Sequence, residues 1–306
     1  MKEYRISVEE GQQGERIDKY IADVFADLSR SYVQKLIKEG RVLINGTVCK
    51  ANDRLSCGDE IFLSAPEAVI PHILPENIPL DILYEDADLI IVNKPKGMVV
   101  HPAPGHYSKT MVNALLYHCR DELSGINGVM RPGIVHRIDM DTTGSVLVCK
   151  NDAAHAAVAA QLKEHSLNRK YIALVHGVIN EDSGKIDAPI GRHPNDRKKM
   201  AVNYKNGRAA VTNYTVLERL KGYTLLECRL ETGRTHQIRV HMASIHYPIV
   251  GDPVYCGLKS PIHLQGQTLH ARTLGLIHPT TKEYLEVDAP LPEYFEKLLS
   301  FLRTQK

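Results

Sequence analysis

The segment RPGIVHRIDMDTTGSVLVCK (residues 131–150) contains the features on which the interpretation of this chain depends. Its second half, GSVLVCK, is an apolar run typical of a buried β-strand. Its first half is a polar loop that places His136, Arg137, Asp139 and Asp141 within six positions. Asp and Thr can form local turns and caps, so a structural role is one interpretation. Cations and carboxylates crowded beside a buried strand favour a functional site, with either aspartate as the candidate carboxylate.

Comparable β-rich runs lie on both sides of this segment, and helical patterns separate some of them. The expected strands are LIIVNKP (89–95), YIALVHGVI (171–179), YTLLECRL (223–230) and EYLEVD (283–288), and the expected helices are NALLYHC (113–119) and AAHAAVAAQLKEH (153–165). Because their order is irregular and does not alternate as βαβα, we expect an α+β domain around a mostly antiparallel, mixed sheet. The closing segment LPEYFEKLLSFLRTQK (291–306) predicts an amphipathic helix that packs on this domain.

A proline-rich stretch, PEAVIPHILPENIPL (66–80), divides this large region from a small N-terminal unit. It holds too many prolines for a helix or a central strand, so we expect an extended linker. The expected domains are residues 1–75, linker included, and residues 76–306. In the small unit we expect a helix over 15–27 and a second helix that Ser29 caps. The Asn45-Gly46 pair then predicts a β-hairpin, which completes a compact α+β module.

Cations gather on or beside the second of these helices, opposed locally by Glu39 alone. They are Arg30, Lys35, Lys38 and Arg41. The charge pattern alone favours a solvated helix face over a surface that contacts RNA phosphates. Residues 15–63 resemble an S4 domain, which is an RNA-binding module, and that resemblance favours the second interpretation.

Composition excludes several classes of protein. The net charge of +2 gives little support for nucleic-acid binding, and no stretch approaches the roughly 18 apolar residues of a membrane helix. The six cysteines are scattered without a CxxC pair, which argues against disulfides and a structural zinc site. The N-terminus lacks the pattern of a signal peptide, so we expect a cytoplasmic protein without a membrane partner.

A second cluster of polar residues is LETGRTHQIRVHMASIHYPIVGDPVYC (230–256). Thr235 is expected to cap a helix, with Arg234 presented at its entrance. His236 and His241 are five positions apart, which differs from the spacing of a zinc-binding HExxH motif. Arg234 and Arg239 can bind phosphates or pair with a carboxylate.

Four segments together resemble the RluA family of pseudouridine synthases, and most closely its RluD branch, which carries an S4 domain. They are VNKPKGMVVHPAPGH (92–106), HRIDMDTTG (136–144), LNRKYIALVHG (167–177) and GRTHQIR (233–239). HRIDMDTTG corresponds to the family signature HRLDxxTSG, with conservative departures at Ile138 and Thr143. The likeness covers almost the whole chain in the family's order.

The resemblance implies the fold of a pseudouridine synthase catalytic domain preceded by an S4 domain. It implies an isomerase that converts uridine to pseudouridine in RNA, with large-subunit (23S) ribosomal RNA or its assembly intermediate as the partner. It further implies no cofactor, no metal and a monomer. A non-catalytic RNA-binding protein, and a synthase that acts on transfer RNA or small-subunit RNA, are the alternatives.

The resemblance also assigns roles to single residues. Asp139 becomes the catalytic carboxylate, Arg234 is expected to pair with it and keep it ionised, and Tyr171 is expected to stack on the uracil. Arg137 is expected to fill the space that the flipped nucleotide leaves. The remaining candidates for RNA contact or loop shape are His136, Lys94, His101, Arg239 and His241. Whether Asp139 attacks C1′, adds to C6 or acts through a glycal stays open.

Overall fold

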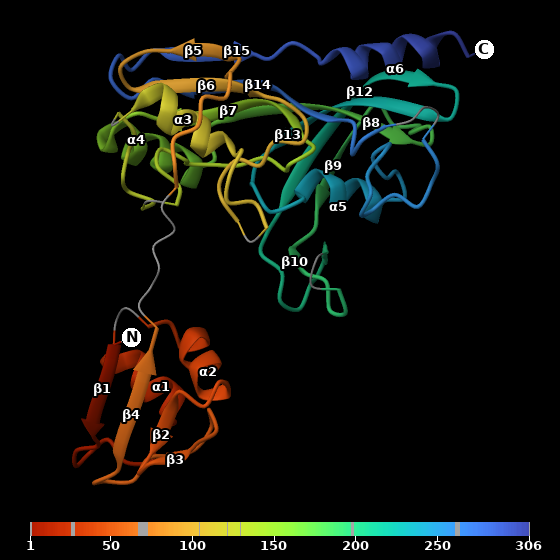
Figure 1. The fold of residues 1–306 in the computed structure, drawn as a ribbon. Coiled ribbons are helices and arrows are strands. Elements are labelled where there is room, and N and C mark those ends of the chain that lie inside the picture. Colours follow the sequence, from red (N-terminus) through yellow and green to blue (C-terminus); the bar gives the residue numbers. More distant parts are fainter. Residues whose placement is uncertain are drawn as a thin grey trace. The chain divides into compact units, whose positions relative to one another are not determined.

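The computed structural model describes residues 2–25, 28–66, 73–103, 105–120, 122–128, 130–196, 199–260 and 264–305. The chain forms two compact units, residues 1–71 and 72–306, which are described separately (Figure 1). Of the expected proline-rich linker, residues 67–72 lie outside the described residues. Residues 73–81 belong to no helix or strand.

The N-terminal unit combines two helices with a four-stranded antiparallel sheet in the order β1-β4-β2-β3. Its helices are α1 (Ile17–Val24) and α2 (Arg30–Lys38). Its strands are β1 (Lys2–Ser7), β2 (Val42–Ile44), β3 (Thr47–Val48) and β4 (Glu60–Ala65). The Ser29 side chain accepts a hydrogen bond from the Tyr32 N–H, which confirms the expected cap. Asn45 and Gly46 both have positive φ, as the expected hairpin turn requires.

The larger unit is built on a nine-stranded sheet in the order β5-β6-β7-β14-β8-β13-β12-β9, with β15 paired to β14. All its pairs are antiparallel except β7 with β14. The expected α+β class and mostly antiparallel sheet are confirmed. The strands are β5 (Ile82–Glu85), β6 (Leu89–Lys94), β7 (Thr143–Cys149), β8 (Asn168–His176), β9 (Ser183–Asp187), β12 (Val211–Leu220), β13 (Tyr223–Leu230), β14 (Leu269–Ile277) and β15 (Tyr284–Asp288). A separate two-stranded ribbon consists of β10 (Ile190–Arg192) and β11 (Met200–Val202).

Four helices cover this sheet: α3 (Met111–Cys119), α4 (Asp152–Lys163), α5 (Gln237–Ser244) and α6 (Glu293–Arg303). Alternate residues of a strand point to opposite faces, which shows how the helices are distributed. In β8, Tyr171 and Ala173 pack in one cluster with α5, whereas Ile172 and Leu174 pack with α6. The helices α5 and α6 therefore lie on opposite faces, as Figure 1 shows.

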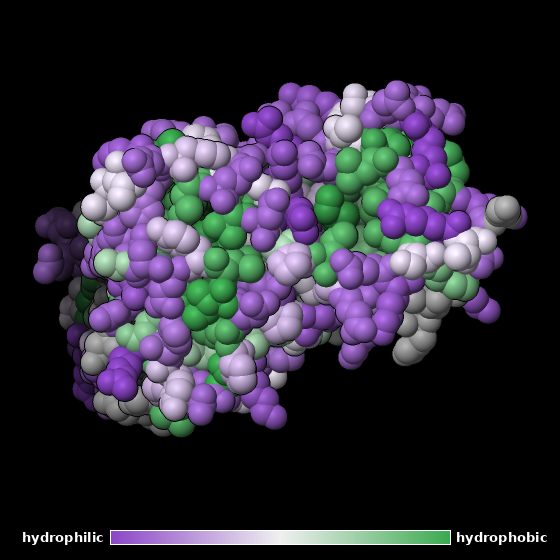
Figure 2. Space-filling view, turned by 90° about the horizontal axis from the view of Figure 1, so that it is seen from above, coloured by the Kyte–Doolittle hydropathy of each residue, from purple (hydrophilic) through white to green (hydrophobic). Residues whose placement is uncertain are grey.

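The apolar side of α6 is buried against the sheet, as its sequence predicts. Phe295, Leu298, Leu299 and Leu302 are all buried. Seen from the side of α6, exposed apolar residues gather in two patches separated by polar residues, one over β5 and β15 and one near α6 (Figure 2). No described helix combines the length and the apolar character that crossing a membrane requires.

A close contact between β7 and β14 fixes the strand that follows the polar loop. Gly144 has φ +106°, and a Cβ at this position would lie 2.2 Å from the carbonyl oxygen of Ala271. Only glycine permits both that conformation and that approach. The Thr143 hydroxyl also lies 2.9 Å from His270 Nδ1. The end of the loop that carries Asp139 is thereby held against the centre of the sheet.

Candidate active site

A cavity of about 560 Å³ lies beside the loop that precedes β7. Its lining includes the three residues that the family resemblance assigned to catalysis, Asp139, Tyr171 and Arg234. These side chains come from a loop, from strand β8 and from the turn before α5. The fold thus brings together three segments that are far apart in the chain, at one concave site of the size that small ligands occupy.

The two candidate aspartates have different surroundings. Asp139 lines the cavity, whereas Asp141 lines neither this cavity nor the smaller one beside it. The side chain of Asp141 lies against Gly266, where an added Cβ would be 2.5 Å from the Asp141 Cβ. The geometry therefore favours Asp139 as the carboxylate that a ligand in the cavity would meet.

The carboxylate of Asp139 is held by Arg239. Arg239 Nη1 donates to Asp139 Oδ2 at 2.8 Å, and the same guanidinium donates to Asp252 through Nε at 2.6 Å and through Nη2 at 2.9 Å. Burial opposes the charge of Arg239, but the hydrogen bonds and charges of Asp252 and Asp139 raise its pKa. Burial alone would raise the pKa of Asp252, yet Arg239 lowers it. This charged triad fixes the position of Asp139.

The expected ion pair between Arg234 and Asp139 is wrong, because Arg239 occupies that place. Arg234 is partly exposed, and its Nε donates to the carbonyl oxygen of Ala209 at 3.0 Å. The expected RNA-backbone role of Arg239 is also contradicted, since its guanidinium is buried and bonded to two carboxylates. An RNA phosphate would have to displace one of them.

The start of α5 also differs from the expectation. The helix begins at Gln237, and its N-cap is His236 in a left-handed conformation with no side-chain cap bond, so Thr235 does not cap it. The buried amide of Gln237 anchors this turn instead. Its Oε1 accepts from the Arg234 N–H and the Thr232 hydroxyl, and its Nε2 donates to Val211 O. This network fixes the direction from which α5 presents Arg239.

His236 contributes to the site in a way that sequence reasoning missed. Its Nε2 lies 3.8 Å from Asp139 Oδ1, and its Nδ1 lies 2.8 Å from the Tyr255 hydroxyl oxygen. Burial lowers the pKa of His236, while the charge of Asp139 acts in the opposite direction. Its place two residues after Arg234 in the GRTHQIR motif was the available signal. Asp252, within GDPVY, carried no signal of its pairing with Arg239.

Tyr171 and Arg169 form the wall of the cavity on strand β8. Both are buried, and burial raises the pKa of the Tyr171 phenol and lowers the pKa of Arg169. Arg169 Nε has no hydrogen-bond partner among the described residues. A buried cation with an unpartnered N–H in a cavity is a candidate for binding a polar ligand. Sequence reasoning did not single out Arg169.

Lys94 is a structural residue, so its expected contact with the RNA backbone is wrong. Its side chain is fully buried, and its Nζ donates to the carbonyl oxygens of Pro95, Met98 and Met140, each at 2.8 Å. Burial lowers the pKa of Lys94 to about 7. Three carbonyl acceptors match the three N–H groups of an ammonium ion. Lys94 thus ties its own loop to the residue after Asp139, which agrees with the expected role in loop shape.

Three histidines from the expected RNA-contacting set have less access to solvent than expected. His241 is fully buried, with its ring nitrogens 2.9 Å from the Thr212 hydroxyl and from Ala188 O, so RNA contact by His241 is ruled out. His101 is also buried and lines the smaller cavity. His136 lines both cavities, and its Nε2 accepts from the Leu147 N–H. Burial lowers the pKa of His136 to about 3, so the ring is neutral.

Comparisons with known proteins identify the family. Residues 88–244 match the family model described as RNA pseudouridylate synthase, and residues 15–61 match the S4 domain. A Bacillus subtilis protein described as an uncharacterized RNA pseudouridine synthase is 53% identical over 99% of both chains. The chain belongs to the RNA pseudouridylate synthase family.

Further relatives agree with this assignment. The ribosomal large subunit pseudouridine synthase D of Zymomonas mobilis is 45% identical over 97% of both chains. The structure of human RNA pseudouridylate synthase domain containing 1 covers 75% of this chain and 97% of its own, with a TM-score of 0.57 and 26% identity. The expected S4 domain and the resemblance to the RluD branch are confirmed. The protein is an RNA pseudouridine synthase, an isomerase of uridine in RNA.

The cations on and beside helix α2 of the S4 domain form more ion pairs than expected. Arg30 pairs with the fully buried Asp18 at 3.1 Å, and Arg41 and Lys35 lie 3.2 and 3.7 Å from Glu39. The expectation that Glu39 alone opposes these cations is therefore wrong. The side chains of Arg30 and Lys35 are still about half exposed or more, at 48% and 66%. They can contact a phosphate without leaving their positions.

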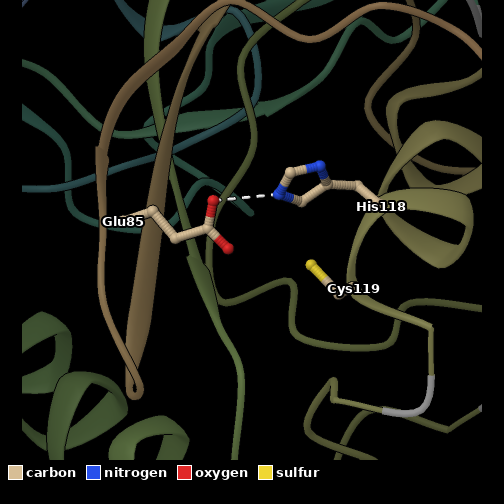
Figure 3. Close-up of side chains that lie close together, drawn as sticks. All are labelled: Glu85, His118 and Cys119. Carbon is tan, nitrogen blue, oxygen red and sulfur yellow. Dashed lines mark hydrogen bonds and ion pairs between the residues drawn. The ribbon is translucent and has the colours of Figure 1, made fainter.

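One cluster in the synthase domain has the composition of a metal site (Figure 3). The donor atoms of Glu85, His118 and Cys119 lie within 4.8 Å of one another. His118 Nε2 is 2.9 Å from Glu85 Oε2, and Lys150 Nζ is 3.2 Å from Glu85 Oε1. Since an ammonium ion already balances the carboxylate, the group fits a hydrogen-bonded surface network better than a metal centre. None of the three lines either cavity.

Proposed function

We propose that this synthase converts uridine to pseudouridine in large-subunit ribosomal RNA, with Asp139 as its catalytic carboxylate. The ribosomal substrate is supported by the name of the Zymomonas mobilis relative and by the S4 domain. The role of Asp139 is supported above all by one observation: it lines the large cavity, and Arg239 holds it there at 2.8 Å.

The chemistry explains why a single carboxylate suffices. The bond between uracil N1 and ribose C1′ breaks, the base turns, and C5 bonds to C1′. Glycosidases use two carboxyl groups because their leaving group departs and water enters. Here the departing base is also the incoming one, so water must be kept out and no redox change is needed. An ionised Asp139 can attack C1′, add to C6, or remove the C2′ proton to form a glycal.

The surrounding side chains suit a flipped uridine. C1′ and C5 cannot exchange partners while the base is stacked, so the nucleotide must leave the RNA helix, and Arg137 at the rim fills the space it vacates. Tyr171 stacks on the uracil. Because burial raises the pKa of its phenol, Tyr171 stays protonated, so it can accept the C5 proton only while passing its own proton to a base such as the Asp139 carboxylate. The buried guanidinium of Arg169 stabilises negative charge on the detached uracil.

We also propose that the enzyme acts in the cytoplasm as a monomer. The proposed cytoplasmic location follows from the proposed substrate, ribosomal RNA. The apolar side of α6 itself is not available to a second copy, because the chain's own sheet covers it.

Replacing Asp139 by Asn tests the catalytic proposal. We expect Asp139→Asn to abolish pseudouridine formation in large-subunit ribosomal RNA while RNA affinity stays the same, because the shape of the side chain is preserved. Asp141→Asn is the matched control and should retain turnover. Substantial turnover by Asp139→Asn would refute the role of Asp139.

The substrate requires a separate experiment. Pseudouridines are mapped at nucleotide resolution in ribosomal and transfer RNA of a deletion strain. We expect sites to be lost from large-subunit RNA and restored by the intact gene. Loss confined to transfer RNA or small-subunit RNA would overturn the ribosomal assignment while leaving the role of Asp139 intact.

A further inference from the structure

A second cavity, of about 290 Å³, lies beside the uridine cavity. The two share the consecutive residues Val135, His136 and Arg137 as a common wall. The rest of the second cavity is lined by His101, Asn127, Met130, Arg131 and Ile134. A polymer whose nucleotide enters the first cavity must therefore pass close to the second.

The second cavity is rich in positive charge. Arg131 and Arg137 are both exposed, and no described carboxylate lies within 4.0 Å of either guanidinium. Arg131 and Arg137 line this cavity together with His101. Burial, followed by the charges of Arg137 and Arg131, lowers the pKa of His101 to about 4. Two guanidinium groups without a carboxylate partner form an anion-binding arrangement.

The neutral groups of the cavity also suit an anion. His101 is 4% exposed, and its Nδ1 is a buried atom with no hydrogen-bond partner among the described residues. His136 accepts the Leu147 N–H at Nε2, so its neutral ring carries hydrogen on Nδ1 and can donate. An ionised phosphate, which only accepts hydrogen bonds, complements these groups.

We propose that this cavity binds a phosphodiester group of the nucleotide next to the target uridine, with Arg131 as its specific anchor. The proposal rests on the proposed action on RNA and adds a positioning role to it. Rotating a uridine out of its stack turns the backbone on either side of it, so the enzyme must hold that backbone. A phosphate held by Arg131 and by His136 of the shared wall fixes the ribose whose C1′ faces Asp139.

The test compares the full-length enzyme with Arg131→Gln and with Lys297→Gln. Lys297 is an exposed cation on α6, outside both cavities, so its variant controls for the loss of one charge. For Arg131→Gln we expect RNA affinity to fall about tenfold and the slope of log affinity against log salt to fall by about one. The turnover rate at saturating RNA should also fall, because the phosphate that Arg131 holds fixes the ribose facing Asp139. Lys297→Gln should match wild type.

A second measurement identifies the phosphate. RNA substrates carry one neutral methylphosphonate at successive positions around the target uridine. We expect one position next to the uridine to weaken wild-type binding about tenfold, with no further effect on Arg131→Gln. Equal weakening of both enzymes at every position, or an affinity of Arg131→Gln equal to that of Lys297→Gln, would overturn the subsite.

The outcome of this test is separable from that of the proposed function. Wild-type enzyme that forms pseudouridine in the same RNA, together with an unaffected Arg131→Gln, refutes the subsite alone. Wild-type enzyme that binds the RNA without forming pseudouridine refutes the proposed action on that RNA.

Discussion

Replacing Arg239 by Lys separates a positioning role from an RNA contact. The change keeps the positive charge but removes the planar guanidinium group. The single ammonium nitrogen of Lys cannot donate in the three directions that the guanidinium uses. Arg239 makes three charge-assisted hydrogen bonds, two to Asp252 and one to Asp139. Such bonds contribute about 1.5–3 kcal/mol each, and Lys can replace one of them. The two lost bonds should therefore lower the free energy of unfolding by about 3–6 kcal/mol.

The effect on catalysis follows from the same geometry. Without the Nη1 bond at 2.8 Å, the Asp139 carboxylate is free to turn away from the ribose. A displacement of about 1 Å costs about 100-fold in rate, so we expect that loss in the single-turnover rate of pseudouridine formation. Affinity for the RNA should change by less than about twofold, because the guanidinium is buried and faces carboxylates.

The assays are thermal unfolding, RNA binding and single-turnover kinetics on the same preparations, with Arg234→Lys as the matched control. Arg234 lies five residues earlier and is partly exposed, and its guanidinium donates one hydrogen bond, to Ala209 O. Its replacement should lower the free energy of unfolding by less than about 1 kcal/mol. If Arg239→Lys kept wild-type stability and rate but lost RNA affinity, Arg239 would be an RNA contact and the triad would have no positioning role.

Two further predictions concern buried charges. Lys94→Met leaves three carbonyl oxygens without donors, so the free energy of unfolding should fall by about 3 kcal/mol while the salt dependence of RNA binding stays unchanged. If RNA binding by folded Lys94→Met depended less on salt than binding by the wild type, Lys94 would contact a phosphate after all. Burial alone would raise the pKa of Asp18, but hydrogen bonds from Arg30, Gln34 and Arg16 hold it at about 2, below its ordinary 3.8. Since the folded pKa is the lower one, this carboxylate stabilises the S4 domain fully above about pH 4 and progressively less as pH falls to 2. Asp18→Asn should therefore cost about 2 kcal/mol at pH 7 and almost nothing at pH 2, measured by urea unfolding, and an equal cost at both pH values would contradict the reasoning.

The sequence by itself determined the local structure of the S4 domain and most elements of the catalytic domain. The cap at Ser29 and the turn at Asn45-Gly46 formed as expected, because each depends on atoms only a few residues apart. The start of α5 was predicted wrongly. The buried amide of Gln237, bonded to a neighbouring strand, sets that turn, and no pattern of caps within the segment reveals such a contact.

For the active site, the sequence narrowed the carboxylate to two aspartates in one loop, and the family signature chose Asp139. Its partner was decided only by tertiary structure. Asp139 and Arg239 are 100 residues apart, and α5 presents Arg239 to the loop because Ile238 and Met242 are packed into the core. Burial, likewise, turned Lys94 and His241 from expected RNA contacts into structural residues. Residue types and spacing predict which groups can react, whereas the packing of distant segments decides which of them meet.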